Sequence, residues 1–128
     1  MTDQEFLTAF EQHTLPEFPH RSHIRMAWLY LRANGWDRGQ QQIRLGIQSL
    51  ALALGAPGKY HETITLFWAR VVDHAISCAP DIEDFDTFVE RYPFLLNSKL
   101  HLTHYSRDLI ASDSARQGWI EPDLRPLP

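Results

Sequence analysis

Apolar side chains recur at helical spacing along four segments of the chain, at about residues 2–12, 19–33, 37–54 and 60–77. The first segment opens with Thr2 and has Glu5 three residues later, which is the pattern of a capping box. Asn34-Gly35 and the run from Gly55 to Gly58 separate the later segments, because glycine commonly ends a helix and proline cannot continue one. No run alternates in the manner of a strand, so the pattern predicts four main helices.

The remainder of the chain divides into shorter pieces. An acid-rich stretch over 81–91 carries Phe85, Phe88 and Val89 and predicts a short amphipathic helix. Residues 97–105 and 106–118 predict further short helical turns, and three prolines among the last ten residues predict an extended tail over about 119–128. The sequence therefore predicts an all-α fold: one helical domain over 1–128, built as a compact bundle of about five to six helices.

The tail has two interpretations. Its sequence from Pro122 to Pro128 resembles a polyproline ligand for an SH3-type groove. The interpretation that we prefer is a tail that packs across the bundle through four apolar side chains. These are Trp119, Ile120, Leu124 and Leu127.

Composition narrows the class of protein. The chain has 128 residues, which fits a single domain, and its net charge of −4 disfavours nucleic acid as a partner. Cys78 is the only cysteine, so neither an internal disulfide nor a cysteine-based zinc site is expected, and a lone thiol fits a reducing interior. We expect no signal peptide, because the first five residues are polar and acidic, and no apolar run reaches the ~20 residues of a membrane span. We expect a cytoplasmic protein without a membrane partner; the four tryptophans permit a homodimer.

Histidine is the informative excess, with seven copies. His20 and His23 are spaced i,i+3 in the first turn of the second predicted helix, so their rings share one face. His61 lies in the first turn of the fourth predicted helix. Because short connections make successive helices antiparallel, the second and fourth helices begin at the same end of the bundle. We therefore expect His20, His23 and His61 to converge.

Three neutral imidazoles suit a divalent transition metal ion such as zinc, copper, iron or nickel. A site with three protein ligands keeps a position open for water or substrate, which is the pattern of a catalytic centre. Glu62 would orient a ligand ring or act in catalysis, Tyr60 would donate to a substrate oxygen, and Arg25 would hold a carboxylate on the ligand. A plainer partner for Arg25 is Glu62 or Asp123.

Other interpretations of the histidines stay open. They could cap helix starts and bond to buried carbonyl groups, or one could act as a base without a metal. His101 and His104 form a second pair at the same spacing, which ranks below the first but could supply a fourth ligand. Dinucleotide, P-loop, α/β-hydrolase and zincin motifs are absent.

Three strings carry a resemblance: residues 18–32, 60–68 and 121–128, with their HxxHxR, YHET and PDLRPLP motifs. They resemble a group of small bacterial proteins to which no activity is assigned. The resemblance covers nearly the whole chain and implies a role for His20, His23 and His61. It gives no weight to His101 and His104.

The sequence thus leads to one hypothesis and its alternative. The hypothesis is a small metal-dependent enzyme, a hydrolase or lyase or an oxidoreductase, with a mononuclear three-histidine site that acts on a small molecule. The alternative is a non-catalytic helical module that binds a ligand or a protein and uses its histidines structurally.

Overall fold

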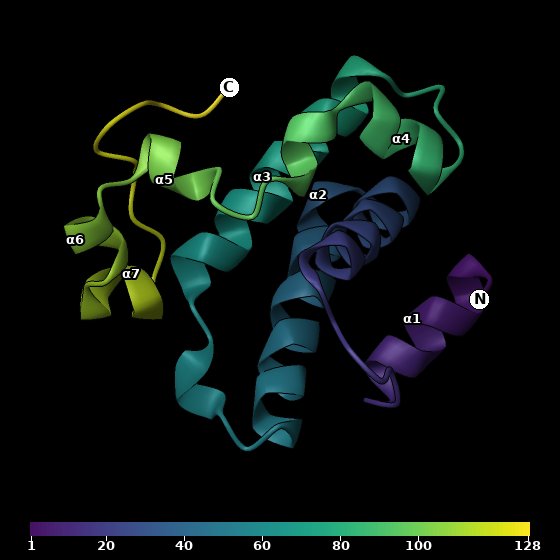
Figure 1. Ribbon diagram of the computed structural model, residues 1–128, viewed down its shortest axis with the longest axis horizontal. Helices are drawn as coiled ribbons and strands as arrows, with labels where there is room; N and C mark the ends of the chain where they lie inside the picture. The colour runs from purple at the N-terminus through teal and green to yellow at the C-terminus, as the bar shows by residue number, and fades with distance from the viewer.

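The computed structural model describes residues 1–128 and contains α-helices and 3-10 turns but no strand, which confirms the predicted all-α class (Figure 1). Two long helices dominate the molecule, and shorter ones follow toward the C-terminus. The seven α-helices are α1 (Asp3–Glu11), α2 (His20–Ala53), α3 (Glu62–Cys78), α4 (Phe85–Arg91), α5 (His101–His104), α6 (Arg107–Ile110) and α7 (Asp113–Gln117). The 3-10 turns are η1 (Pro57–Lys59) and η2 (Pro93–Leu96).

Helix α1 begins at the predicted capping box. The Thr2 hydroxyl accepts a hydrogen bond from the Glu5 amide at 3.1 Å, and the Glu5 carboxylate accepts one from the Thr2 amide at 2.9 Å. These bonds satisfy amides that have no partner inside the helix. The helix buries Phe6, Ala9 and Phe10 against the rest of the protein.

Helix α2 consists of two arms, residues 20–34 and 36–53, that meet at Gly35. Gly35 has φ of 75° and ψ of −176°, a conformation that essentially only glycine adopts, so the helix breaks where the sequence predicted. The arms fold onto each other: a Cβ on Gly39 would lie 3.0 Å from Cα of Leu31. On a straight helix these two positions would be about 12 Å apart. Gly39 therefore permits the close contact that gives α2 its bent shape.

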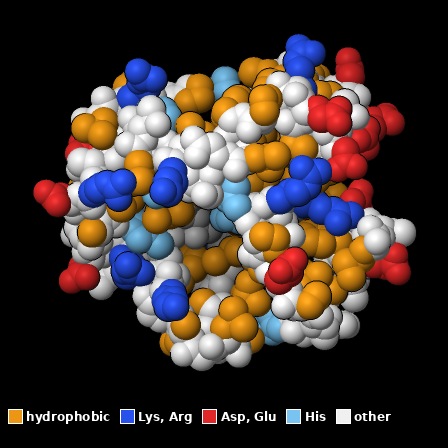
Figure 2. All heavy atoms as spheres, viewed as in Figure 1, with side chains coloured by type: hydrophobic (Ala, Val, Ile, Leu, Met, Phe, Trp, Pro, Cys, Tyr) orange, Lys and Arg blue, Asp and Glu red, His pale blue; other side chains and the backbone are white.

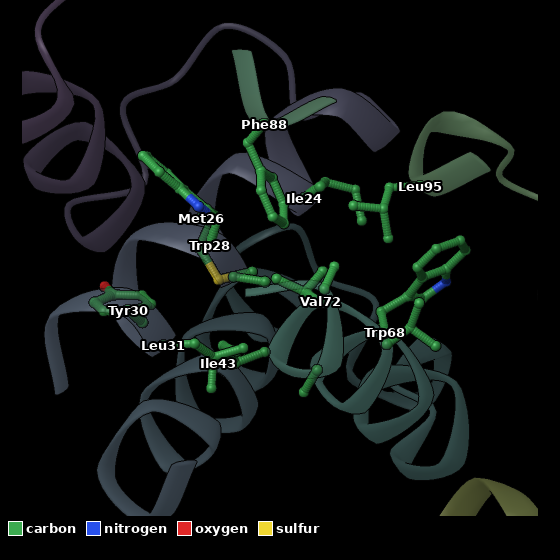
Figure 3. Close-up of a cluster of buried hydrophobic side chains, with 14 of the residues drawn as sticks. Ile24, Met26, Trp28, Tyr30, Leu31, Ile43, Trp68, Val72, Phe88 and Leu95 are labelled. Atoms are coloured by element: carbon green, nitrogen blue, oxygen red, sulfur yellow. The ribbon is translucent and has the colours of Figure 1, made fainter. Parts of the chain in front are cut away.

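The core lies between the first arm of α2, helix α3 and helix α4 (Figure 3). Trp28 packs on Phe85 and Phe88 with ring centroids 5.8 Å apart in each pair. Phe85, Phe88 and Val89 are buried as the amphipathic pattern predicted. The side chains labelled in Figure 3 are Ile24, Met26, Trp28, Tyr30, Leu31, Ile43, Trp68, Val72, Phe88 and Leu95.

The C-terminal part packs against α3 and confirms two of the four predicted side-chain contacts of the tail. Thr63 of α3 donates to the Gly118 carbonyl at 2.7 Å and accepts from the Ile120 amide at 3.1 Å. Trp119 and Leu127 pack on the core. The prediction was wrong for Leu124, which is 59% exposed because the chain there is held through its backbone, with the Leu124 amide donating to the His104 carbonyl. None of the helices combines the length and apolarity that crossing a membrane requires.

Candidate functional site

A cavity of about 390 Å³ lies where α2 begins, beside the start of α3 and the second arm of α2. In Figure 2 the molecule is hollowed near the middle of the face shown, with histidine side chains beside the hollow and hydrophobic side chains around it. Lysine and arginine side chains gather over the C-terminal helices on the left of this view, and acidic ones at its right edge. The cavity is lined by Phe18, His20, His23, Ile47, Leu50, Ala51, Leu54, Ala56, Lys59, Tyr60, His61, Ile64 and Thr65. The structure therefore brings the three predicted histidines to one cavity.

His20 and His23 face each other from the first turns of α2. Their ring centroids are 6.2 Å apart and their planes are perpendicular. Nε2 of His20 lies 2.8 Å from the Leu95 carbonyl, and the ring rests on the indole of Trp68 at 4.5 Å. Since a carbonyl only accepts, this nitrogen carries the proton. Nε2 of His23 is buried and has no hydrogen-bond partner within the protein.

His61 has a structural role that the sequence left as an alternative. The prediction placed His61 in the first turn of its helix, but α3 begins at Glu62, so His61 is the N-cap residue. Its Nδ1 accepts from the Ile64 amide at 3.0 Å, and its Nε2 donates to the Ile110 carbonyl at 2.7 Å. Both ring nitrogens are therefore engaged, and the ring holds the start of α3 against α6.

Burial keeps all these rings neutral. It lowers the pKa of His23 from 6.5 to about 4, and the neighbouring His20 ring adds to this effect. Burial also lowers the pKa of His20, although the Leu95 carbonyl favours the proton. The pKa of His61 is lowered by burial as well, against the opposing effect of the Ile110 carbonyl. The cavity thus presents uncharged imidazoles, which donate or accept hydrogen bonds according to tautomer.

The second histidine pair lies close to the first site but outside the lining of the cavity. Nδ1 of His101 is buried without a partner, and burial followed by the nearby His61 ring lowers the pKa of His101. His104 is buried, and its Nδ1 donates to the Arg125 carbonyl at 2.9 Å. His104 therefore anchors the tail, which the sequence pattern did not indicate.

No group of three or more histidine, cysteine, aspartate or glutamate side chains is arranged to hold a metal ion. His20, His23 and His61 share a cavity, but the cap bond of His61 uses the lone pair that a metal would need. A mononuclear three-histidine centre with zinc, copper, iron or nickel therefore stays a prediction. Forming it would require His61 to release the Ile64 amide.

Two of the predicted catalytic residues form a polar cluster at the edge of the cavity. Tyr60 lines the cavity and donates its hydroxyl to Glu62 at 2.5 Å, while Arg44 binds the same carboxylate through Nε and Nη2, the latter at 2.6 Å. Burial raises the pKa of Glu62, but the bonds from Arg44 and Tyr60 outweigh it and leave the pKa below its usual value. Burial and the same carboxylate raise the pKa of Tyr60 to about 12. Glu62 is thus an ionised partner of Arg44, and its hydrogen bonds go to Arg44 and Tyr60 and not to a histidine ring.

Arg25 lies elsewhere, and its predicted role is not supported. It binds the Asp3 carboxylate at 2.8 Å and the Met1 carbonyl at 3.2 Å, and its guanidinium stacks over the Phe6 ring at 4.5 Å. Neither Glu62 nor Asp123 is its partner, because α1 packs beside the first turns of α2. Arg25 ties α1 to α2.

The apolar wall of the cavity was not predicted from the sequence. Ile47, Leu50 and Leu54 recur at helical spacing in the third predicted helix; together with Ala51 they line the cavity, and Leu54 is 72% exposed. The sequence does contain an indication of this wall, because the apolar stripe ends directly before the η1 turn that leads to His61. Comparison of the chain with protein-family models, with curated proteins and with solved structures finds no match.

Proposed function

We propose that the protein binds a small, mainly apolar molecule whose polar group pairs with the histidines of the cavity. The observation that carries this proposal is the buried, unpartnered Nε2 of His23, whose ring lines a cavity with apolar walls. A buried polar atom without a partner costs about 1–3 kcal/mol, and a ligand that supplies the missing hydrogen bond removes that cost.

The shape and lining of the cavity support the proposal. A volume of about 390 Å³ falls in the range of small-molecule sites, which are concave and mostly apolar with a few convergent polar groups. His20 and His61 are held by carbonyl groups of η2 and α6, so the polar end of the cavity is rigid before a ligand arrives. A preorganised site loses little conformational freedom on binding.

A titration with hexanoate and 1-hexanol, followed by backbone amide NMR, tests the proposal. We expect dose-dependent shifts at Ile47, Leu50 and Ile64, which line the cavity, and none in α4, which contributes no residue to its lining. A His23→Phe variant keeps the volume apolar and should weaken both ligands several-fold. Shifts spread evenly over the surface, or no shifts up to tens of millimolar ligand, would refute the proposal.

A metal-dependent enzyme is the second candidate. Nε2 of His23 is free of protein partners, and the His20 ring beside it has Nδ1 available because its only hydrogen bond is through Nε2. A bound transition metal ion would activate water or dioxygen for reaction with the molecule in the cavity. His20 and His23 would hold such an ion, with His61 joining after loss of its cap bond.

Metal analysis of protein purified without a histidine tag tests this candidate. Stoichiometric metal that is lost in both His20→Ala and His23→Ala variants supports it. Wild-type protein that takes up no zinc, copper, iron or nickel in equilibrium dialysis excludes it and leaves the binding proposal standing. The proposal also includes a cytoplasmic location without a nucleic-acid partner, based on the lone cysteine and the charge of −4, and a homodimer, which the four tryptophans permit.

A further inference from the structure

A second apolar hollow adjoins the histidine cavity. It has a volume of about 190 Å³ and is lined by residues of α1, the loop that follows α1, and α2. The two hollows share Phe18, Leu50 and Leu54 as lining residues. The two hollows therefore adjoin, one bordered by His61 and the other by the loop after α1, and together they are called the groove.

The two ends of this groove differ in charge. Lys59 is the single charged residue that lines the histidine cavity, and Glu17 is the single charged residue that lines the second hollow. An anionic group is favoured near Lys59 and disfavoured near Glu17. The floor between them is apolar, with no charged side chain.

The walls of the groove also select against a peptide. Most of the lining of the histidine cavity comes from helices, whose backbone amides and carbonyls are bonded within each helix. An extended peptide laid in the groove would bury backbone groups that find no partners there. A hydrocarbon chain has no such groups and gains from burial at every methylene.

We propose that the ligand is a single-chain amphiphile, a medium- or long-chain carboxylic acid, whose head lies between Lys59 and His23 and whose chain runs past Leu50 toward the α1 loop. This inference rests on the proposed function, which requires only that a small molecule binds in the histidine cavity. It adds that the second hollow holds the end of the hydrocarbon chain and that Lys59 binds the carboxylate head of the ligand.

Calorimetric titration with straight-chain carboxylates of increasing length, kept below their micelle concentrations, tests the chain. From hexanoate to dodecanoate we expect the affinity to rise by about twofold to fourfold per methylene. Leu15→Asp changes a residue that lines only the second hollow, and it should weaken dodecanoate at least tenfold while leaving hexanoate unchanged. Leu52→Asp is the matched control, since Leu52 is 67% exposed and lines neither hollow.

A comparison of dodecanoate with 1-dodecanol tests the head. Lys59→Met should weaken the acid several-fold and leave the alcohol unchanged, whereas Lys99→Met, which changes the other lysine of the chain, should affect neither. If hexanoate binds but the affinity does not rise with chain length, or Leu15→Asp has no selective effect, this inference is wrong and the proposed function stands. If no member of the series binds, both fail.

Discussion

Replacing His61 separates its role in folding from any role in chemistry. In the His61→Ala variant the Ile64 amide loses its cap and the Ile110 carbonyl loses its donor. The lost cap costs about 1 kcal/mol and the lost bond to the carbonyl about another 1 kcal/mol. Removing the buried ring adds to this, so the free energy of unfolding should fall by about 2–3 kcal/mol.

The His61→Asn variant refines the prediction. Asparagine is among the best N-cap residues but is too short to reach the Ile110 carbonyl, so it should recover about 1 kcal/mol of the loss. Urea unfolding followed by circular dichroism measures both values, with a chelator in every sample so that bound metal does not contribute.

Two results would refute the reasoning about the His61 ring. One is a His61→Ala variant as stable as the wild type in chelator, and the other is a His61→Asn variant no more stable than His61→Ala. Either would mean that the cap and carbonyl bonds do not hold α3 in place. A loss of stability that appears only when metal is present would instead favour His61 as a metal ligand.

Three further predictions concern the fold around the site. The pKa of His23 falls from 6.5 to about 4 on folding, so the unfolded chain binds more protons than the folded protein between these pH values. The free energy of unfolding of metal-free protein should therefore decrease as pH falls from 6.5 to 4. Urea titrations of a His23→Leu variant should show a weaker dependence on pH. Gly39→Ala should destabilise the protein by about 1 kcal/mol and lower its melting temperature, because the clash with the Leu31 backbone exceeds the gain in helix propensity. Gly58→Ala is the control and should leave the melting temperature unchanged, because a Cβ at Gly58 has no other atom within 4 Å. Thr63→Val removes both hydrogen bonds to the tail and should lower the free energy of unfolding by about 1–3 kcal/mol. Limited proteolysis should then cleave the C-terminal segment faster than in the wild type, and an unchanged cleavage rate would contradict this prediction.

The parts of the fold that local chemistry determines could be predicted from the sequence. The Thr2–Glu5 capping box and the break at Gly35 depend on residues within one turn, and both lie where the pattern predicted them. The apolar stripe of α3 is likewise buried against α2. How closely the two arms of α2 approach each other could not be predicted, because this depends on the missing side chain of Gly39 at their contact.

The candidate site shows the same division. Antiparallel topology correctly predicted that the starts of the second and fourth predicted helices would be close, so His23 and His61 share a cavity. The sequence pattern could not predict which atoms each ring contacts. The carbonyl that binds the His61 ring, for example, belongs to Ile110, which is 49 residues away in the sequence. The partner of Arg25 was mispredicted for the same reason: Asp3 is brought to it only by the packing of α1.

The imidazole of His23 gives the most direct test of the binding proposal. Protein labelled with ¹⁵N on its histidine rings can be titrated with hexanoate, with the exposed ring of His74 as the internal reference. We expect a saturable shift of the Nε2 resonance of His23 and no change at His74. A His23 resonance that stays fixed while hexanoate binds elsewhere would contradict the claim that this buried nitrogen receives the ligand.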